Sequence, residues 1–120
     1  MISRSHRFHG YGSLKYVYRA GSTVRGPLFA VKSVSNDKRA SYRVSVVVSR
    51  KVNKSAVARN RISRRLYAAV RLLQDDIVLP HDIVITIFSS DVLQTSSDQL
   101  RQQLKNQMAS AGVVVKRVQR

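Results

Sequence analysis

The chain has 120 residues, no cysteine and a formal net charge of +16, with 22 Lys and Arg against six Asp. This length fits one domain (residues 1–120), and the lack of cysteine excludes disulfides and thiolate metal sites. No apolar run approaches the roughly 20 residues of a membrane helix and the N-terminus has no signal-peptide core, so we expect a cytoplasmic protein.

The first elements are predicted to be a short helix and a strand. Ser13 is the expected N-cap, Gly21 the stop, and one face carries the apolar residues Leu14, Val17 and Tyr18. Residues 24–34 are mostly apolar and predict one strand, with Pro27 near its beginning. Residues 35–38 then have the composition of a turn.

A second strand is predicted over residues 42–48, where three consecutive valines indicate burial on both faces. A long helix follows, with Asn53 or Ser55 as its N-cap. Its apolar residues recur at i, i+4, i+7, i+8 and i+11 and form one stripe: Ile62, Leu66, Ala69, Val70 and Leu73. This spacing predicts a helix that buries one side.

The remaining elements are a strand over residues 82–88 and a helix that Ser96 or Ser97 caps and Gly112 ends. The stripe of this helix comprises Leu100, Leu104, Met108 and Ala111. Residues 113–120 are either an extra strand or a frayed basic end. The strand–helix–strand order over residues 42–88 predicts a crossover within one sheet that has helices packed on it, and general rules favour a right-handed one.

The outer side of the long helix points to a polyanionic partner. Residues 51–71 contain seven Lys and Arg and no acid, and residues 1–74 hold 17 of the 22 basic residues against one Asp. The guanidinium group of arginine binds two phosphate oxygens at once. The alternative, a face that only contacts water, would usually include acidic partners at i, i+4. A membrane-surface role is the other alternative, but the core needs the apolar stripe. We therefore favour nucleic-acid binding.

Protein-based phosphodiester cleavage would need clustered carboxylates or an acid–base set, and this chain offers little of either. Asp75, Asp76 and Asp82 are the one acidic cluster close in sequence, and their helix-end and strand-start positions account for them. His6 and His9 fall in the basic terminus, and His81 is expected in a solvated loop. We predict no catalytic residue in the protein and assign no metal site.

Aromatic residues interleaved with basic ones suit the stacking of single-stranded bases. They are Tyr11, Tyr16, Tyr18, Phe29 and Tyr42. Aromatic residues of a small domain usually belong to its core, and we expect that of Phe29. Tyr18 is the candidate for a groove above the sheet, whereas Tyr16 should point elsewhere.

The segment Ala56-Val-Ala-Arg-Asn-Arg-Ile-Ser-Arg-Arg-Leu66 resembles the signature helix, with its RNR motif, of the bacterial ribonuclease P protein subunit. The preceding Arg43-Val-Ser-Val-Val-Val-Ser-Arg-Lys51 looks like the strand before that helix. Leu14–Gly21, Val24–Phe29 and Asp82–Ile85 are similar to further family segments in the same order. The resemblance covers about residues 7–112 and leaves a basic tail at 113–120.

The resemblance implies an α+β fold, a single-domain α/β sandwich in which helices pack on a small mixed sheet and the βαβ crossover is left-handed. It also implies a role in removing the 5′ leader of precursor tRNA. The partners would be the catalytic RNA subunit and precursor tRNA, with Mg²⁺ bound mainly by the RNA; we expect neither a membrane nor DNA among them. A small basic ribosomal-type RNA-binding protein is the alternative, which the ordered series of motifs disfavours.

Two sets of site residues follow from the matched positions. The set expected to bind the RNA subunit is Lys51, Lys54, Arg59, Asn60, Arg61, Arg64 and Arg65. The set expected to bind the leader, in a cleft between the first helix and the sheet, is Leu14, Tyr18 and Lys32. Two positions depart from the family pattern: Leu14 replaces a frequent aromatic residue, and Phe88 stands where an arginine is frequent.

Overall fold

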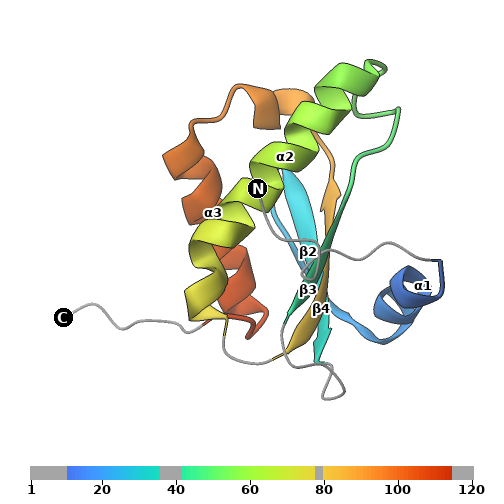
Figure 1. Cartoon of the computed structure of the whole chain (residues 1–120), viewed down its shortest axis with the longest axis vertical. Helices are drawn as coiled ribbons and strands as arrows, with labels where there is room; N and C mark the ends of the chain where they lie inside the picture. Colours follow the sequence, from blue (N-terminus) through green and yellow to red (C-terminus); the bar gives the residue numbers. More distant parts are fainter. Residues whose placement is uncertain (1–10, 36–41, 78–79, 115–120) are drawn as a thin grey trace.

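The computed structural model describes residues 11–35, 42–77 and 80–114. They form three layers, with helices α2 (Ala56–Leu73) and α3 (Ser97–Ser110) on one side of a sheet and helix α1 (Tyr11–Ala20) on the other (Figure 1). We call the two sides of the sheet the α2 face and the α1 face. The predicted α+β architecture with helices on a small mixed sheet is confirmed.

The sheet has four strands in the order β1-β2-β4-β3. Strand β2 (Phe29–Ser35) pairs antiparallel with both β1 (Ser22–Arg25) and β4 (His81–Ile87). Strand β3 (Arg43–Val47) pairs parallel with β4, so α2 is the crossover between them. The predicted crossover within one sheet is confirmed. The left-handedness that the family resemblance implies stays a prediction.

The prediction of one strand over residues 24–34 was wrong. The chain turns at residues 26–28 and forms a hairpin in which Arg25 pairs with Ala30 and the Gly26 N–H donates to the Phe29 carbonyl over 3.0 Å. The dipeptide Gly26-Pro27 is a turn signal, whereas Pro27 alone also fits the start of a strand. The hairpin adds an edge strand, β1, to the sheet.

Helix α1 begins at Tyr11, so the predicted cap Ser13 lies inside its first turn. The first N–H groups of a helix lack intrahelical partners in any case, and a serine is tolerated among them. The predicted stop at Gly21 is confirmed. A Cβ at Gly21 would lie 2.6 Å from the Val17 carbonyl oxygen, and only glycine fits between α1 and β2 without a shift.

The caps of the two long helices follow the sequence. The Ser55 hydroxyl accepts the Ala58 N–H at the start of α2, and the Asn53 side chain accepts the Ser55 N–H just before it. Ser96 caps α3, accepting the Gln99 N–H, and Gly112 after its end has a φ of 77°. Val114 forms an isolated bridge with Ile77, and residues 115–120 of the predicted tail lie outside the described part.

The main core lies between the α2 face and helices α2 and α3. All five residues of the predicted α2 stripe are buried there, as are Leu100, Leu104 and Met108 of α3 and Phe29 of β2. A smaller cluster under α1 joins Val17 to Val84. Val46 and Val48 pack on the main core and Val47 on the cluster under α1, but because β3 is an edge strand all three are only half-buried, less than predicted.

An ion pair between partly buried Arg43 and buried Asp82 joins the two parallel strands at their beginnings. The Asp82 carboxylate accepts two hydrogen bonds from Arg43, at 2.9 and 2.8 Å, and this bonding raises the pKa of Arg43 above its ordinary value. Asp82 is therefore a structural partner and not merely a strand-start residue. The neighbouring His81 is buried as the first residue of β4, so its expected place in a solvated loop was wrong.

Tyr42, just before β3, also belongs to the fold. It is buried, and its hydroxyl donates to the Gln74 side-chain oxygen over 3.0 Å. Burial raises the pKa of Tyr42 to about 12, an effect that nearby Arg71 opposes. Its place in the core excludes the base-stacking role that the sequence left open.

We predict that Asp82→Ala lowers the free energy of unfolding by about 3 kcal/mol, because it leaves the largely desolvated Arg43 guanidinium without its carboxylate. Urea unfolding checks this. Asp98→Ala is the matched control: it removes an exposed pair with Arg101 at 3.5 Å and should cost at most about 0.5 kcal/mol. Equal losses in the two variants would contradict the structural role of Asp82.

Candidate nucleic-acid interface

The outward side of α2 presents cations without acidic partners. Asn60, Arg61 and Arg64 are exposed, and none of the described residues pairs with the two guanidinium groups. Val57, Arg61 and Arg64 follow one another at i, i+4 and i+7, opposite the buried stripe. We call Val57, Asn60, Arg61 and Arg64 the outer face of α2. Because the opposite side is held in the core, these guanidinium groups point to solvent at fixed positions.

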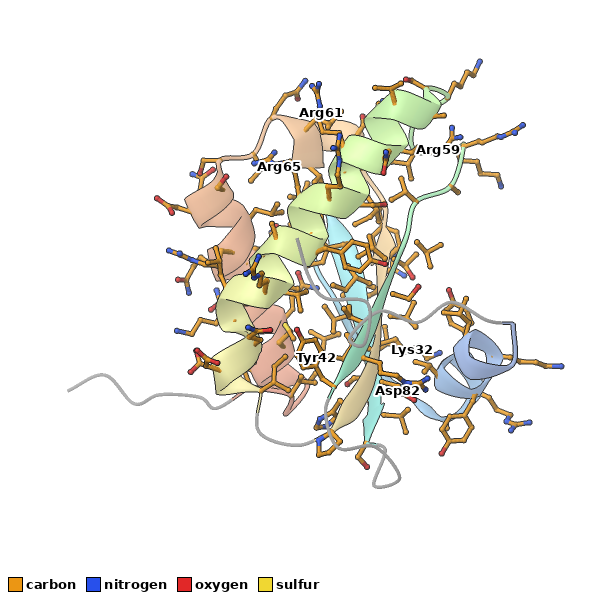
Figure 2. The ribbon with its side chains drawn as sticks, viewed as in Figure 1. Lys32, Tyr42, Arg59, Arg61, Arg65 and Asp82 are labelled. Atoms are coloured by element: carbon orange, nitrogen blue, oxygen red, sulfur yellow. The ribbon has the colours of Figure 1, made fainter. Side chains whose placement is uncertain are left out.

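Two other arginines of the predicted set have structural partners. Arg65 donates to the Val92 and Thr95 carbonyls and thereby ties α2 to the segment before α3 (Figure 2). Arg59 donates to the carbonyls of Asn53 and Lys54, each over 3.0 Å, and holds the loop that enters the helix. Their RNA contact stays a prediction, and only their remaining N–H groups are available for it.

The loop before α2 adds charge at the same end of the helix. Lys51 and Lys54 are exposed, and the first turn of α2 contains no acidic residue. The N-terminus of a helix carries a partial positive charge and unpaired N–H groups, which favour anions. The start of α2 thus combines lysines, the helix dipole and the outer face in one basic surface.

The structure brings Tyr18 and Lys32 together, as the predicted leader site requires. The Lys32 ammonium donates to the Tyr18 carbonyl over 2.5 Å and lies 5.6 Å from the centre of the Tyr18 ring. Figure 2 shows Lys32 pointing from the sheet toward α1. The tyrosine is 44% exposed, and an ammonium has three donors, so both side chains can still meet a nucleotide.

The two departures from the family pattern have distinct structural outcomes. Leu14 is half-buried and packs against the Val17–Val84 cluster, which makes it a packing residue of α1. Phe88 is 39% exposed, and the Arg25 guanidinium carbon lies 4.5 Å from the centre of its ring. A guanidinium therefore still lies at this position, supplied by β1.

The acidic residues do not assemble into a site. Among residues 11–35, 42–77 and 80–114, no three His, Cys, Asp or Glu side chains are placed to hold a metal ion. Asp75 is exposed at the end of α2, and Asp82 is engaged by Arg43. In the same ranges, no helix is long and apolar enough to cross a membrane.

Sequence reasoning missed three features of this surface. The contact of Arg25 with Phe88 depends on the hairpin, and the Gly26-Pro27 dipeptide was the signal that could have revealed it. The carbonyl contacts of Arg65 leave no trace in sequence. Gln107 of α3, for which no role was predicted, is buried, and its amide donates to the Val24 and Phe29 carbonyls over 3.1 and 3.0 Å.

Comparisons with known proteins identify the family. The family model for ribonuclease P matches residues 2–112. The ribonuclease P protein component of Synechococcus elongatus is 30% identical over 116 residues, which cover 94% of this chain and 95% of that protein. That of Brevibacillus brevis is 31% identical over 113 residues, covering 94% and 88%.

Solved structures agree on the fold. An RNase P protein from Staphylococcus aureus is similar with a TM-score of 0.80 at 23% identity, covering 92% of this chain and 98% of that one. The RNase P protein from Thermotoga maritima gives a TM-score of 0.74 at 21% identity, covering 83% and 92%. Because the family model and the two relatives each match nearly the whole length of the chain, the chain belongs to the family of bacterial ribonuclease P protein components.

Proposed function

We propose that this protein binds the catalytic RNA subunit of ribonuclease P through the outer face of α2 and the 5′ leader of precursor tRNA through the α1 face of the sheet. The observation that carries the proposal is the pair of acid-free guanidinium groups, Arg61 and Arg64, fixed outward by a buried stripe. Membership of the ribonuclease P family supports the RNA subunit as the partner. The working particle would be a cytoplasmic ribonucleoprotein.

The leader assignment rests on a second pair of residues. Tyr18 offers a partly exposed ring and Lys32 an ammonium beside it, which together match the base and the phosphate of an unpaired nucleotide. Asp82, on the same face, is neutralised by Arg43, so it does not repel a phosphate there. Mature tRNA lacks the leader, and this contact would therefore favour substrate over product.

Catalysis would belong to the RNA subunit and its Mg²⁺. The residues that the structure describes offer no set of three ligands for such an ion, and Asp82 on the α1 face already accepts two hydrogen bonds from Arg43. The protein's own contribution would be electrostatic and positional: it binds phosphates, holds the leader and keeps the particle assembled.

The first test removes charge from the outer face of α2. Arg61→Ala with Arg64→Ala should weaken binding of the RNA subunit by about 1.5 kcal/mol or more per lost contact. It should also lower the slope of log affinity against log salt by about one per residue. Filter binding across a salt series measures both, and circular dichroism verifies the fold.

The matched control removes the same amount of charge from α3, the second helix on the α2 face. Arg101 and Lys105 lie on α3, and their double alanine variant should leave the affinity and its salt slope nearly unchanged. If both double variants weakened binding equally, net charge alone would explain the loss. If Arg61→Ala with Arg64→Ala bound normally, the assignment of α2 would be wrong.

The second test asks whether the protein cleaves RNA alone. Purified protein with Mg²⁺ should leave precursor tRNA intact, and cleavage should begin when the RNA subunit is added. Gel analysis of labelled precursor gives the answer. Cleavage that persisted after all other RNA was removed, and that disappeared with Asp75→Ala and Asp76→Ala, would assign a catalytic site to the protein.

The third test concerns the leader. Tyr18→Ala with Lys32→Ala should raise the dissociation constant of the holoenzyme for precursor tRNA about tenfold, and barely change that for mature tRNA, because one stacked base contributes about 1–3 kcal/mol. Leu14→Phe adds a ring beside Tyr18 and should tighten precursor binding. Equilibrium binding of labelled precursor and mature tRNA measures these effects.

The control for this test lies on the same helix. Tyr16 and Arg19 are exposed on α1, and replacing both by alanine removes one ring and one charge outside the Tyr18–Lys32 pair. This variant should bind precursor normally. A Tyr18 and Lys32 variant that weakened mature and precursor tRNA to the same extent would show that the pair does not read the leader.

A further inference from the structure

The contact between Arg25 and Phe88 forms a second exposed surface of cation and ring. The guanidinium carbon lies 4.5 Å from the ring centre, within the range of a cation–π contact, and the phenylalanine is 39% exposed. Neither a carboxylate nor a carbonyl among the described residues pairs with Arg25. We call these two residues the stacking pair.

The stacking pair lies on the same face of the sheet as Lys32. Arg25 pairs with Ala30, and Ala30 pairs with Thr86, so all three share one face with Lys32 and Val84 by the two-residue period of strands. Phe88 follows β4 two residues after Thr86. Lys32 pairs with Val84, four residues before Phe88, and with Thr23, two residues before Arg25. Phe88 therefore lies roughly 13 Å and Arg25 roughly 7 Å further along the sheet than Lys32.

The far end of this face leads toward the basic start of α2. Strands β3 and β4 are parallel, so the chain leaves Val47 and Ile87 at the same end of the sheet. The segment after Val47 carries Arg50, Lys51 and Lys54 into α2, which extends past the sheet at that end (Figure 1). A single-stranded RNA that is bound at the Tyr18–Lys32 pair and continues along this face would reach the stacking pair and then the basic surface at the start of α2.

Hydrogen bonds from Phe88, Gly26 and Gln107 fix the backbone beside the stacking pair. The Phe88 N–H donates to the Leu28 carbonyl over 2.8 Å, and the Gly26 N–H closes the hairpin onto Phe29. The Gln107 amide binds carbonyls of both hairpin strands, and a Cβ at Gly26 would lie only 2.4 Å from its oxygen. A surface that needs no ordering on binding loses less entropy when a ligand stacks on it.

We propose that Arg25 and Phe88 are a second subsite for an unpaired nucleotide of the leader, separate from the Tyr18–Lys32 pair. A base stacks on the ring beside the guanidinium, and the guanidinium binds the adjoining phosphate. The proposal rests on the proposed leader function and extends it to a second nucleotide. Any base can occupy such a subsite, since every base has a flat face.

The experiment measures affinity of the reconstituted holoenzyme for precursor tRNA with leaders shortened one nucleotide at a time. Phe88→Leu keeps the apolar bulk without the ring and should weaken binding about tenfold for long leaders only. Arg25→Ala should act in the same range, whereas Arg101→Ala on α3 should have no effect. Circular dichroism confirms that each variant is folded.

Abasic nucleotides locate the subsite. At one leader position, removing the base should weaken wild-type binding but leave the Phe88→Leu holoenzyme unchanged, because both changes remove the same contact. That position should differ from the one where an abasic nucleotide cancels the effect of Tyr18→Ala. The same position for both variants would overturn the second subsite.

The outcomes separate this proposal from the proposed leader function. If Tyr18→Ala depends on leader length and Phe88→Leu does not, the stacking pair is structural and the leader function stands. If neither variant depends on leader length, the leader function itself fails. Loss of affinity for mature tRNA in Phe88→Leu would also overturn the subsite.

Discussion

The packing of one stripe of α2 onto the sheet is the constraint on which the rest of this structure depends. Ile62, Leu66 and Val70 are fully buried against the strands, and this contact sets the rotation of the helix about its axis. With the rotation fixed, Arg61 and Arg64 point outward and Arg65 is directed at the carbonyls before α3. A shift of the buried stripe by one residue would turn Arg61 and Arg64 away from the outer face. Core packing and the proposed RNA contact are therefore coupled through the same helix.

The two ends of the sheet contribute differently to stability and to binding. Near the beginnings of β3 and β4, the Arg43–Asp82 pair joins the two strands, and buried Tyr42 ties the chain before β3 to Gln74 after α2. At the opposite end, the hairpin turn, Phe88 and the loop into α2 present aromatic and cationic groups to solvent. The arginine at the beginnings of the strands is therefore paired with a carboxylate, whereas the cations at the opposite end of the sheet stay available to a polyanion.

The sequence predicted the helices because their signals are local. The α2 stripe, the Ser55 and Ser96 caps and the Gly112 stop each depend on residues within a few positions, and the structure confirms them. The hairpin was missed because apolar residues on both sides of Gly26 masked the turn. His81 was misplaced because its burial depends on strands distant in sequence, and the ion pair of Asp82 was missed because Arg43 lies 39 residues away. The contact of Arg25 with Phe88 likewise arises only when strands pair, and that of Lys32 with Tyr18 only when α1 packs on the sheet.

We infer that the RNA subunit contacts the outer face of α2 and does not contact α3. Site-specific labelling of the two helices tests this inference most directly. The natural chain lacks cysteine, so Val57→Cys on α2 and Asn106→Cys on α3 each introduce one thiol at an exposed position. Binding of the RNA subunit should slow thiol alkylation strongly at residue 57 and leave it unchanged at residue 106. Equal alkylation rates with and without RNA at residue 57, or protection at residue 106 alone, would contradict the account.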